Sequence, residues 1–177
     1  MIILIGPSAS GKTAVGKLLE QKFNIKKVVT YTTRPMRLGE IDGVDYNFLS
    51  KEEFIEKRNN NFFFETMTYS SNYYGTSIES LSNNSYMILD LNGYQKYLES
   101  SIKFSAYYLK CDKEIRRKRM ILRCDSNKSI EERLKNDDAA FNLSQIKFDG
   151  LVIDTSNITL DEIASIIIDD YRGKNGR

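Results

Sequence analysis

Apolar and polar residues alternate along the chain in blocks that predict strands and helices in turn. Residues 1–5 are all apolar and end at a glycine, which is typical of a short strand buried on both faces. Residues 14–20, just beyond the turn that follows, have the pattern of an amphipathic helix. Further strands are expected at 26–30, 44–49, 62–69, 85–91, 103–109 and 149–155, and further helices at 51–58, 93–100 and 113–123, from 129 and from 159.

This alternation predicts an α/β fold, in which a parallel sheet carries helices on both faces. Residues 31–85 are richer in strand and interrupt the alternation, which indicates an inserted lobe. Capping boxes mark the starts of three helices. They pair Ser50 with Glu53, Ser129 with Glu132 and Thr159 with Glu162.

The turn after the first strand carries the most specific chemical signal in the sequence. It reads Gly6, Pro7, Ser8, Ala9, Ser10, Gly11, Lys12, Thr13 and fills every fixed position of the pattern G-x-x-x-x-G-K-[ST]. In such a loop, backbone N–H groups and the N-terminus of the next helix face a polyphosphate. Lys12 is expected to reach the β- and γ-phosphates and the Thr13 hydroxyl to ligate Mg²⁺. A chance glycine turn is the alternative, and the flanking strand and helix favour the nucleotide site.

Composition narrows the chemistry that the site can use. The 177 residues carry a net charge of +2 and no histidine. Without histidine there can be no Ser-His-Asp triad and no His-ligated zinc, so catalysis has to use Lys, Arg, carboxylates, hydroxyls or a metal. The small net charge gives no indication of a nucleic-acid partner, and no apolar run approaches the ~18 residues of a membrane span. Cys111 and Cys124 form no disulfide framework, so reduced thiols and a cytoplasmic location are expected.

Two arginines lie three residues apart on a predicted polar loop. Arg34 and Arg37 would repel each other unless an anion lies between them, and the guanidinium fork suits a phosphate. A solvated surface loop explains the same pattern equally well. Farther along the chain, Glu65 and the tyrosines around Tyr74 fit either ordinary aromatic packing or a polar pocket for a base and a phosphate.

Two further features suit a site built around the phosphate loop. Asp90 ends a hydrophobic strand, where an acid can hold Mg²⁺ through water. Arg119 and Arg123 are four residues apart on a basic helix and therefore point the same way. This helix, the polar loop at 124–128 and the next helix form a candidate lid over phosphates, and a solvated charged face is the alternative.

Taken together, these residues resemble the guanylate kinase family. The resemblance covers nearly the whole chain and is densest between Thr32 and Thr76. Outside the phosphate loop the matching residues are Thr30, Thr32, Thr33, Arg34, Arg37, Gly39, Glu40, Gly43, Asp45, Tyr46, Asn47, Phe48, Glu53, Phe54, Phe64, Glu65, Asn72, Tyr73, Tyr74, Gly75, Thr76, Ile88, Leu89, Asp90, Arg119, Arg123, Ile130, Arg133 and Leu134.

The resemblance implies a role for each residue of the donor side. ATP would be bound by the eight residues of the phosphate loop, and Asp154 would lie near the adenine. Mg²⁺ would be held by Thr13 and Asp90. The catalytic residues would be Lys12, Arg34, Arg119, Arg123 and Arg133, of which the last three would close over the transferring phosphoryl group.

The resemblance also implies an acceptor site. The phosphate of GMP would be bound by Arg34, Arg37, Tyr46 and Tyr74. Glu65 would accept hydrogen bonds from guanine N1 and N2, Thr30 and Thr76 would contact the O6 side, and Asp90 would complete the GMP site. Adenine has no such pair of donors, so the carboxylate of Glu65 would select guanine.

Three positions depart from the family pattern. Asn92 stands where the family usually has an acid, which leaves the acceptor range open. Asp154 stands where Asn is frequent. The lid between Arg123 and Ser129 is one residue short.

The implied architecture is a three-layer α/β/α phosphate-loop kinase core at 1–30, 86–112 and 134–172. An NMP-binding lobe would occupy 31–85, a helical lid 113–133 and a flexible tail 173–177.

The implied activity is Mg²⁺-assisted transfer of a phosphoryl group from ATP to GMP, and to dGMP, by a cytoplasmic monomer or homodimer without nucleic-acid or membrane partners. One alternative is a kinase acting on another nucleotide or a ribosyl phosphate. The other is a non-catalytic guanylate-kinase-like interaction module, against which the intact phosphate loop argues.

Overall fold

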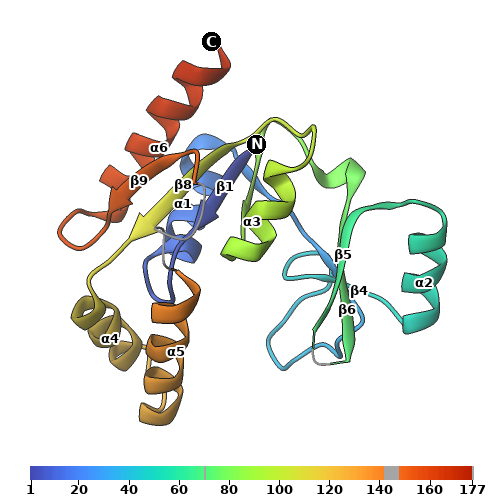
Figure 1. Ribbon diagram of the computed structural model, residues 1–177, viewed down its shortest axis with the longest axis horizontal. Helices are drawn as coiled ribbons and strands as arrows, with labels where there is room; N and C mark the ends of the chain where they lie inside the picture. Colours follow the sequence, from blue (N-terminus) through green and yellow to red (C-terminus); the bar gives the residue numbers. More distant parts are fainter. Residues whose placement is uncertain (70, 142–147, 177) are drawn as a thin grey trace. The chain divides into compact units, whose positions relative to one another are not determined.

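The computed structural model describes residues 1–69, 71–141 and 148–176 (Figure 1). The chain divides into two compact units. The first unit contains Met1–Lys26 and the chain from Tyr86 onward, and the second contains Lys27–Ser85. The second unit thus begins at Lys27, whereas the sequence pattern begins the inserted lobe at 31.

A five-stranded sheet forms the centre of the first unit, in the order β2-β7-β1-β8-β9. β1 pairs in parallel with β7 on one side and with β8 on the other, and β8 pairs in parallel with β9. The carboxyl ends of these strands therefore meet at one edge, where α/β folds bind ligands. The strands are β1 (Ile2–Ile5), β2 (Lys26–Lys27), β7 (Ser85–Ile88), β8 (Ser105–Lys110) and β9 (Leu151–Asp154).

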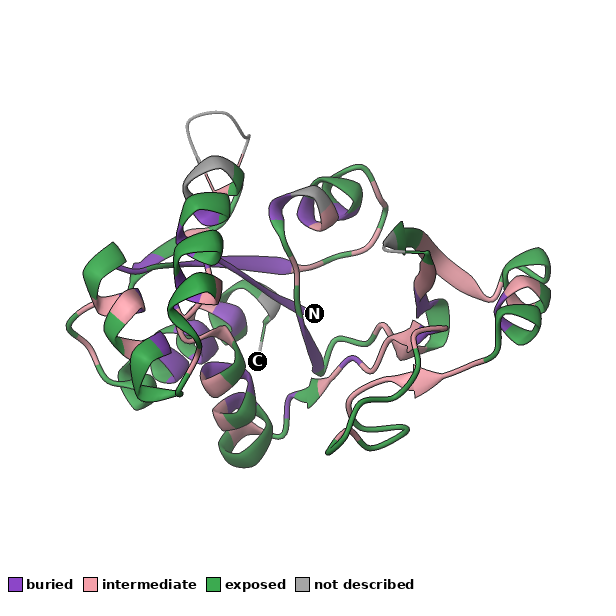
Figure 2. Ribbon diagram, turned by 90° about the horizontal axis from the view of Figure 1, so that it is seen from below, coloured by how far each residue is buried: buried purple, intermediate pink, exposed green. Residues whose placement is uncertain are grey.

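Helices cover both faces of β1. Ile2 and Leu4 belong to a buried cluster with residues of α1 and α6, such as Leu19 and Ile167. Because side chains alternate along a strand, the equally buried Ile3 and Ile5 point to the opposite face. In Figure 2 the central strands are coloured as buried. The helices of this unit are α1 (Lys12–Phe23), α3 (Leu91–Leu98), α4 (Lys113–Leu122), α5 (Asn127–Ala140) and α6 (Leu160–Asn175).

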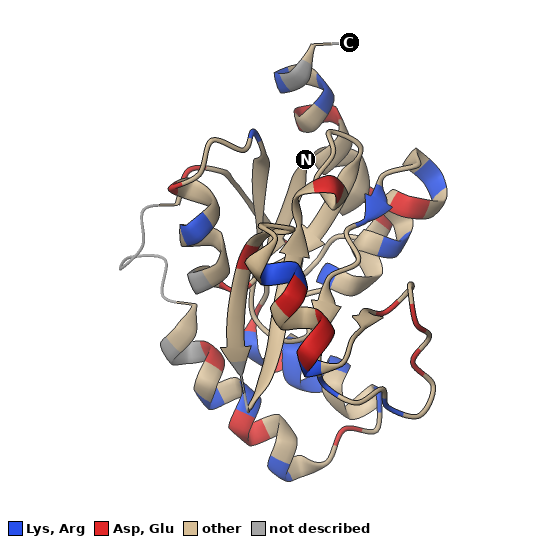
Figure 3. Ribbon diagram, turned by 90° about the vertical axis from the view of Figure 1, so that its right-hand side faces the viewer, with Lys and Arg blue, Asp and Glu red and all other residues tan. Residues whose placement is uncertain are grey.

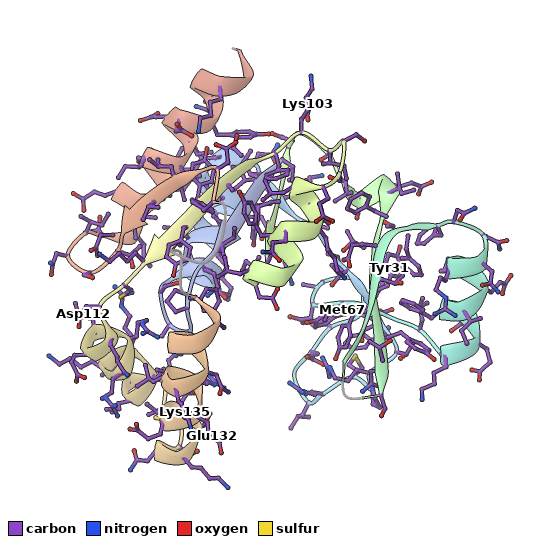
Figure 4. The ribbon with its side chains drawn as sticks, in the orientation of Figure 1. Tyr31, Met67, Lys103, Asp112, Glu132 and Lys135 are labelled. Atoms are coloured by element: carbon purple, nitrogen blue, oxygen red, sulfur yellow. The ribbon has the colours of Figure 1, made fainter. Side chains whose placement is uncertain are left out.

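The second unit is built on a mixed four-stranded sheet, in the order β4-β3-β6-β5. β3 pairs in parallel with β4 and antiparallel with β6, and β5 and β6 form an antiparallel pair. Helix α2 (Lys51–Asn59) buries Phe54, which stacks on Phe63 with ring centroids 4.5 Å apart. Tyr31, labelled in Figure 4, meets Phe63 edge to face at 5.5 Å, so aromatic packing holds this small unit together. Its strands are β3 (Tyr31–Thr32), β4 (Asn47–Phe48), β5 (Phe63–Tyr69) and β6 (Asn72–Ser77), and a 3₁₀ turn spans Ile78–Ser80.

The predicted α/β fold with a parallel sheet is confirmed, and so are two of the capping boxes. The Ser50 hydroxyl accepts from the Glu53 amide, and Thr159 and Glu162 form the same reciprocal pair at the start of α6. Among the described residues, no helix combines the length and the apolar character needed to cross a bilayer.

Four sequence-based boundaries differ from those of the structure. Helix α5 starts at Asn127 because Ser126, not Ser129, is its N-cap, and the Ser129 amide donates to the Ser126 hydroxyl. The expected strands at 26–30 and 44–49 are reduced to two residues each, β2 and β4. Helix α6 continues through Asn175 into the expected flexible tail; Arg177 lies outside the described residues.

The packing of α1 against β7 leaves no space for a side chain at Gly16, and this gives the first prediction. A Cβ there would lie 2.4 Å from Cε2 of the buried Tyr86 ring. We expect Gly16→Ala to lower the free energy of unfolding by about 1–3 kcal/mol through overpacking, although Ala favours helix. Urea denaturation measures the change.

Gly173→Ala is the matched control. Gly173 lies within α6, and no atom lies within 4 Å of the position that a Cβ would take, so helix propensity alone decides the outcome. We expect this variant to gain up to about 1 kcal/mol. Equal stabilisation of both variants would contradict the close packing of α1 on Tyr86.

Candidate functional site

The phosphate loop leaves the sheet at the end of β1. Gly6 has φ +144°, and a Cβ on it would lie 2.4 Å from the backbone oxygen of Leu109 in β8. Gly11 has φ +105° and forms the N-cap of α1. Glycine at these two positions lets the loop pass close to β8 and then enter the helix, so the N-terminus of α1 opens at the loop.

Lys12 folds back over the same loop. Its Nζ donates to the carbonyl oxygen of Gly6 at 2.5 Å and to that of Pro7 at 2.7 Å. Burial lowers the pKa of Lys12 to about 8, and the nearby Asp137 carboxylate opposes that shift. The ammonium group is therefore already at the loop that it is expected to serve.

A cavity of about 530 Å³ lies beside the loop, entirely within the first unit. Six predicted site residues line it together with apolar side chains from α4 and the start of α6, namely Ala9, Gly11, Lys12, Thr13, Arg119 and Arg123. A cavity with cationic groups at one end and aliphatic groups elsewhere fits a phosphorylated ligand with an apolar or aromatic part. The full lining is Ala9, Gly11, Lys12, Thr13, Ala14, Lys17, Arg119, Leu122, Arg123, Ile158 and Leu160.

Asp154 is not part of that lining. Its Oδ1 accepts from the Ser156 amide at 3.0 Å, and its Oδ2 lies 3.9 Å from Nζ of Lys110. These contacts hold the pKa of Asp154 below its ordinary value, the Ser156 hydrogen bonds contributing most. The side chain is exposed at the end of β9.

The lid arginines occupy two different environments. Arg119 is fixed against the loop, donating through Nη1 to the Ala9 carbonyl at 3.2 Å and through Nη2 to the Thr155 carbonyl at 2.8 Å. Arg123 and Arg133 are about half exposed and share Oδ2 of Asp125, at 3.4 and 3.2 Å. One carboxylate thus holds two guanidinium groups together despite their like charge.

Asp137 and Arg116 are site-adjacent residues that the sequence reasoning missed. They form a buried ion pair of 2.9 Å, and Asp137 also accepts from the Ser8 amide and hydroxyl at 2.9 and 3.2 Å. Nothing local in the sequence distinguishes Asp137 from the other polar residues of its helix. In Figure 3 basic and acidic residues are interspersed along the chain, so the charge pattern does not distinguish the Asp137–Arg116 pair.

Asp90 stands at the carboxyl end of β7, next to β1. The Leu89 amide donates to the Leu4 carbonyl at 3.1 Å, and Asp90 Oδ1 caps α3 by accepting from the Gly93 amide at 2.7 Å. Its carboxylate and the Thr13 hydroxyl are hard oxygen donors of the kind that Mg²⁺ uses together with water and phosphate oxygens. The chemistry of the two residues fits that ion. The described residues contain no cluster of three or more acidic, Cys or His side chains that could hold a metal by themselves.

The second unit contains the predicted acceptor residues other than Asp90. Arg34 forms an ion pair of 2.7 Å with Glu40, whose other carboxylate oxygen accepts from the Arg37 amide at 2.7 Å. The hydrogen bond to Arg34, with that from Arg37, holds the pKa of Glu40 below its ordinary value. Glu40 thus offsets the charge of Arg34, while Arg37 is exposed.

Aromatic rings flank this arginine. The Arg34 guanidinium carbon lies 5.4 Å from the centroid of the Tyr46 ring, and Tyr46 lies 6.2 Å from the Tyr74 ring. This arrangement places two phenolic side chains and a guanidinium group in one cluster, which is suited to an anion.

Glu65 and Thr76 face each other across β5 and β6. They are register partners, and the Thr76 hydroxyl donates to Glu65 Oε1 at 2.9 Å. Thr30 accepts through its carbonyl oxygen from the Asn47 amide at 2.8 Å, ahead of β3. The side chain of Asn92 lies outside the described part of the structure.

Comparisons with known proteins agree with this geometry. The family model for guanylate kinase matches residues 1–169. The guanylate kinase of Anaplasma phagocytophilum is 34% identical, in an alignment covering 94% of this chain and 85% of that protein. The guanylate kinase of Desulfotalea psychrophila is 31% identical, with coverage of 100% and 92%.

A solved structure shares the fold over the same length. The crystal structure of guanylate kinase from Anaplasma phagocytophilum superposes with a TM-score of 0.68 at 27% identity, covering 100% of this chain and 86% of that chain. Full-length agreement in sequence and in structure, together with an intact phosphate loop, decides the assignment: the chain belongs to the guanylate kinase family.

Proposed function

We propose that this guanylate kinase transfers the γ-phosphoryl group of ATP to the phosphate of GMP, giving ADP and GDP, and that it accepts dGMP in the same way. One observation carries the donor half of the proposal. Lys12 lies over the loop carbonyls and lines one cavity with Thr13, Arg119 and Arg123 at the N-terminus of α1. Transfer between phosphates depends mostly on positioning and charge neutralisation, which these groups supply without histidine.

On the donor side, the loop amides bind the β- and γ-phosphates, and Lys12 exchanges its carbonyl contacts for phosphate oxygens. Arg119 stands at the edge of the loop and contacts the transferring group. Arg123 approaches from the end of α4 and Arg133 from α5, and Asp125 in the turn between the two helices keeps them together. The aliphatic part of the cavity, including Leu122 and Leu160, receives the adenine.

Thr13 and Asp90 would hold Mg²⁺ with the ATP phosphates. When bound there, the ion would supply positive charge that offsets the negative charge of the phosphates.

On the acceptor side, Arg34 and Arg37 bind the GMP phosphate with the hydroxyls of Tyr46 and Tyr74. Glu65 reads guanine N1–H and N2–H₂, and the Thr76 hydroxyl orients the carboxylate by its hydrogen bond to Oε1. Thr30 and Thr76 lie toward O6. The enzyme works in the cytoplasm as a monomer or homodimer, and the free thiols of Cys111 and Cys124 support the cytoplasmic location.

An acceptor panel with ATP and Mg²⁺ tests the proposal and the role of Glu65 together. We expect turnover of GMP and dGMP, with kcat/KM for GMP about 10⁴-fold above that for AMP because adenine lacks the donors that Glu65 requires. In Glu65→Gln the GMP-to-AMP ratio is expected to fall at least about 100-fold. A coupled assay of ADP formation measures each acceptor.

Glu79→Gln is the control for this variant, because Glu79 is exposed in the 3₁₀ turn that follows β6. It should leave the acceptor ratio unchanged. Turnover of another nucleotide or of a ribosyl phosphate with none of GMP would overturn the proposed acceptor, and an unchanged ratio in Glu65→Gln would remove Glu65 from base recognition.

Lys12→Ala tests the donor half. We expect kcat to fall about 100- to 1,000-fold, since a preorganised cationic donor to the transferring group is lost. The free energy of unfolding should fall by no more than about 3 kcal/mol, because the charge-assisted hydrogen bonds to Gly6 and Pro7 are lost while the cost of burying the charge is relieved. Steady-state kinetics and urea denaturation measure the two quantities.

Lys22→Ala is the matched control on the same helix. Lys22 lies in the last turn of α1, at the end of the helix opposite to Lys12, and forms an exposed ion pair of 2.5 Å with Asp161. Its removal should leave kcat unchanged. Comparable turnover in Lys12→Ala and Lys22→Ala would show that the loop lysine does not act on phosphate.

A further inference from the structure

Helix α5 sends one buried carboxylate to the phosphate loop. Asp137 is 8% exposed, and its Oδ2 accepts from the Ser8 amide and from Nη1 of Arg116, both at 2.9 Å. Its Oδ1 accepts from the Ser8 hydroxyl at 3.2 Å. Arg116 is 5% exposed and also donates through Nε to the Cys111 carbonyl at the end of β8. One network therefore joins the loop, β8, α4 and α5.

A buried network of this kind fixes the positions of the side chains and peptide groups that take part in it. A buried carboxylate is tolerated only when its oxygens are paired, and two of the three donors to Asp137 belong to the single residue Ser8. The Ser8 N–H donates to Asp137 of α5. The orientation of that peptide unit, and with it the direction of the amides that follow, is set by a residue 129 positions away in sequence.

A second contact fixes the same helix against the same loop. Ile130 and Leu134 of α5 are buried with Met120 of α4, and Ala9 packs on this cluster. Ser8 and Ala9 are thus held by one polar and one apolar contact from α5. The opposite side of the helix is exposed, with Glu132 and Lys135 labelled in Figure 4.

Arg133 precedes Asp137 by four residues and lies on the same face of α5, about one turn or 5.4 Å along the axis. Any shift or rotation of α5 would move Arg133 relative to the loop. The Asp137 contacts determine that position, because they fix the register of the helix at Ser8.

We propose that Asp137 is a positioning residue of the phosphoryl transfer: it holds the Ser8 peptide and helix α5 in one register, so that the loop amides and Arg133 meet the transferring group together. This inference rests on the proposed function. It assigns to Asp137 a role in orientation, with no contact to either nucleotide.

Two neutral double variants of the full chain separate this role from simple stabilisation. Asp137→Asn with Arg116→Gln keeps an acceptor oxygen for the Ser8 amide. The Gln side chain is a hydrogen-bond partner for the Asn side chain that this variant introduces. Asp137→Leu with Arg116→Met removes the charges and the acceptor together, and an apolar pair of similar size often restores stability. Both are compared with the parent and with Glu132→Ala, an exposed acid on the same helix, by thermal unfolding and by kcat and KM for ATP.

We expect Asp137→Asn with Arg116→Gln to keep most of the parental kcat and Glu132→Ala to match the parent. Asp137→Leu with Arg116→Met should lose at least about tenfold in kcat at a similar melting temperature, with a smaller change in KM for ATP, because misplacement of reacting groups slows transfer more than it weakens binding. Equal kcat in the two double variants would overturn the proposal.

If Asp137→Leu with Arg116→Met does not fold, Asp137→Ala with Arg116→Gln takes its place, since it also lacks the acceptor, and the same comparison decides. The parent is assayed first. A parent that does not phosphorylate GMP overturns the proposed function and this inference with it, whereas an active parent with equal double variants overturns only the role of Asp137.

Discussion

The close passage of the phosphate loop over strand β8 is the constraint on which the site depends. Strand β1 is fully buried and has parallel neighbours on both sides. The phosphate loop therefore begins at the carboxyl end of β1, between the ends of β7 and β8. There Gly6 approaches the Leu109 oxygen too closely for any side chain. The buried hydroxyl of Thr155 then donates to the Ser10 carbonyl at 3.0 Å, while Arg119 holds the Ala9 carbonyl. Contacts from distant segments thus fix the conformation of a loop that is short and consists mostly of small residues.

The two proposed anion sites differ in their chemistry. The first presents backbone amides and one lysine at a helix N-terminus, where burial lowers the pKa of Lys12 to about 8. The second presents a guanidinium group between a carboxylate and aromatic rings, with Glu40 orienting Arg34. Amides are suited to wrap a polyphosphate chain, and an arginine fork is suited to a single terminal phosphate. This difference agrees with a donor nucleotide at the first and an acceptor monophosphate at the second.

The sequence predicted what depends on local pattern. The strand before the phosphate loop, the loop itself and the capping boxes at Ser50 and Thr159 are each encoded within a few residues. The start of α5 was missed because Ser126 and Ser129 are both competent caps and only the surrounding packing selects one. The Asp137 contact to Ser8 spans 129 residues, so no spacing rule could reveal it. The pairing of Arg34 with Glu40 was likewise invisible, although both residues belong to the stretch that carries the family resemblance.

We propose that two anions are bound separately, one by the phosphate loop with Lys12 and the other by Arg34 and Arg37. A crystal structure with GMP and a non-hydrolysable ATP analogue tests it most directly. The account predicts triphosphate oxygens within about 2.7–3.2 Å of the loop amides and of Lys12 Nζ, and the GMP phosphate bonded by Arg34 and Arg37. Arginines that face away from every phosphoryl group, or a triphosphate bound away from the N-terminus of α1, would contradict it.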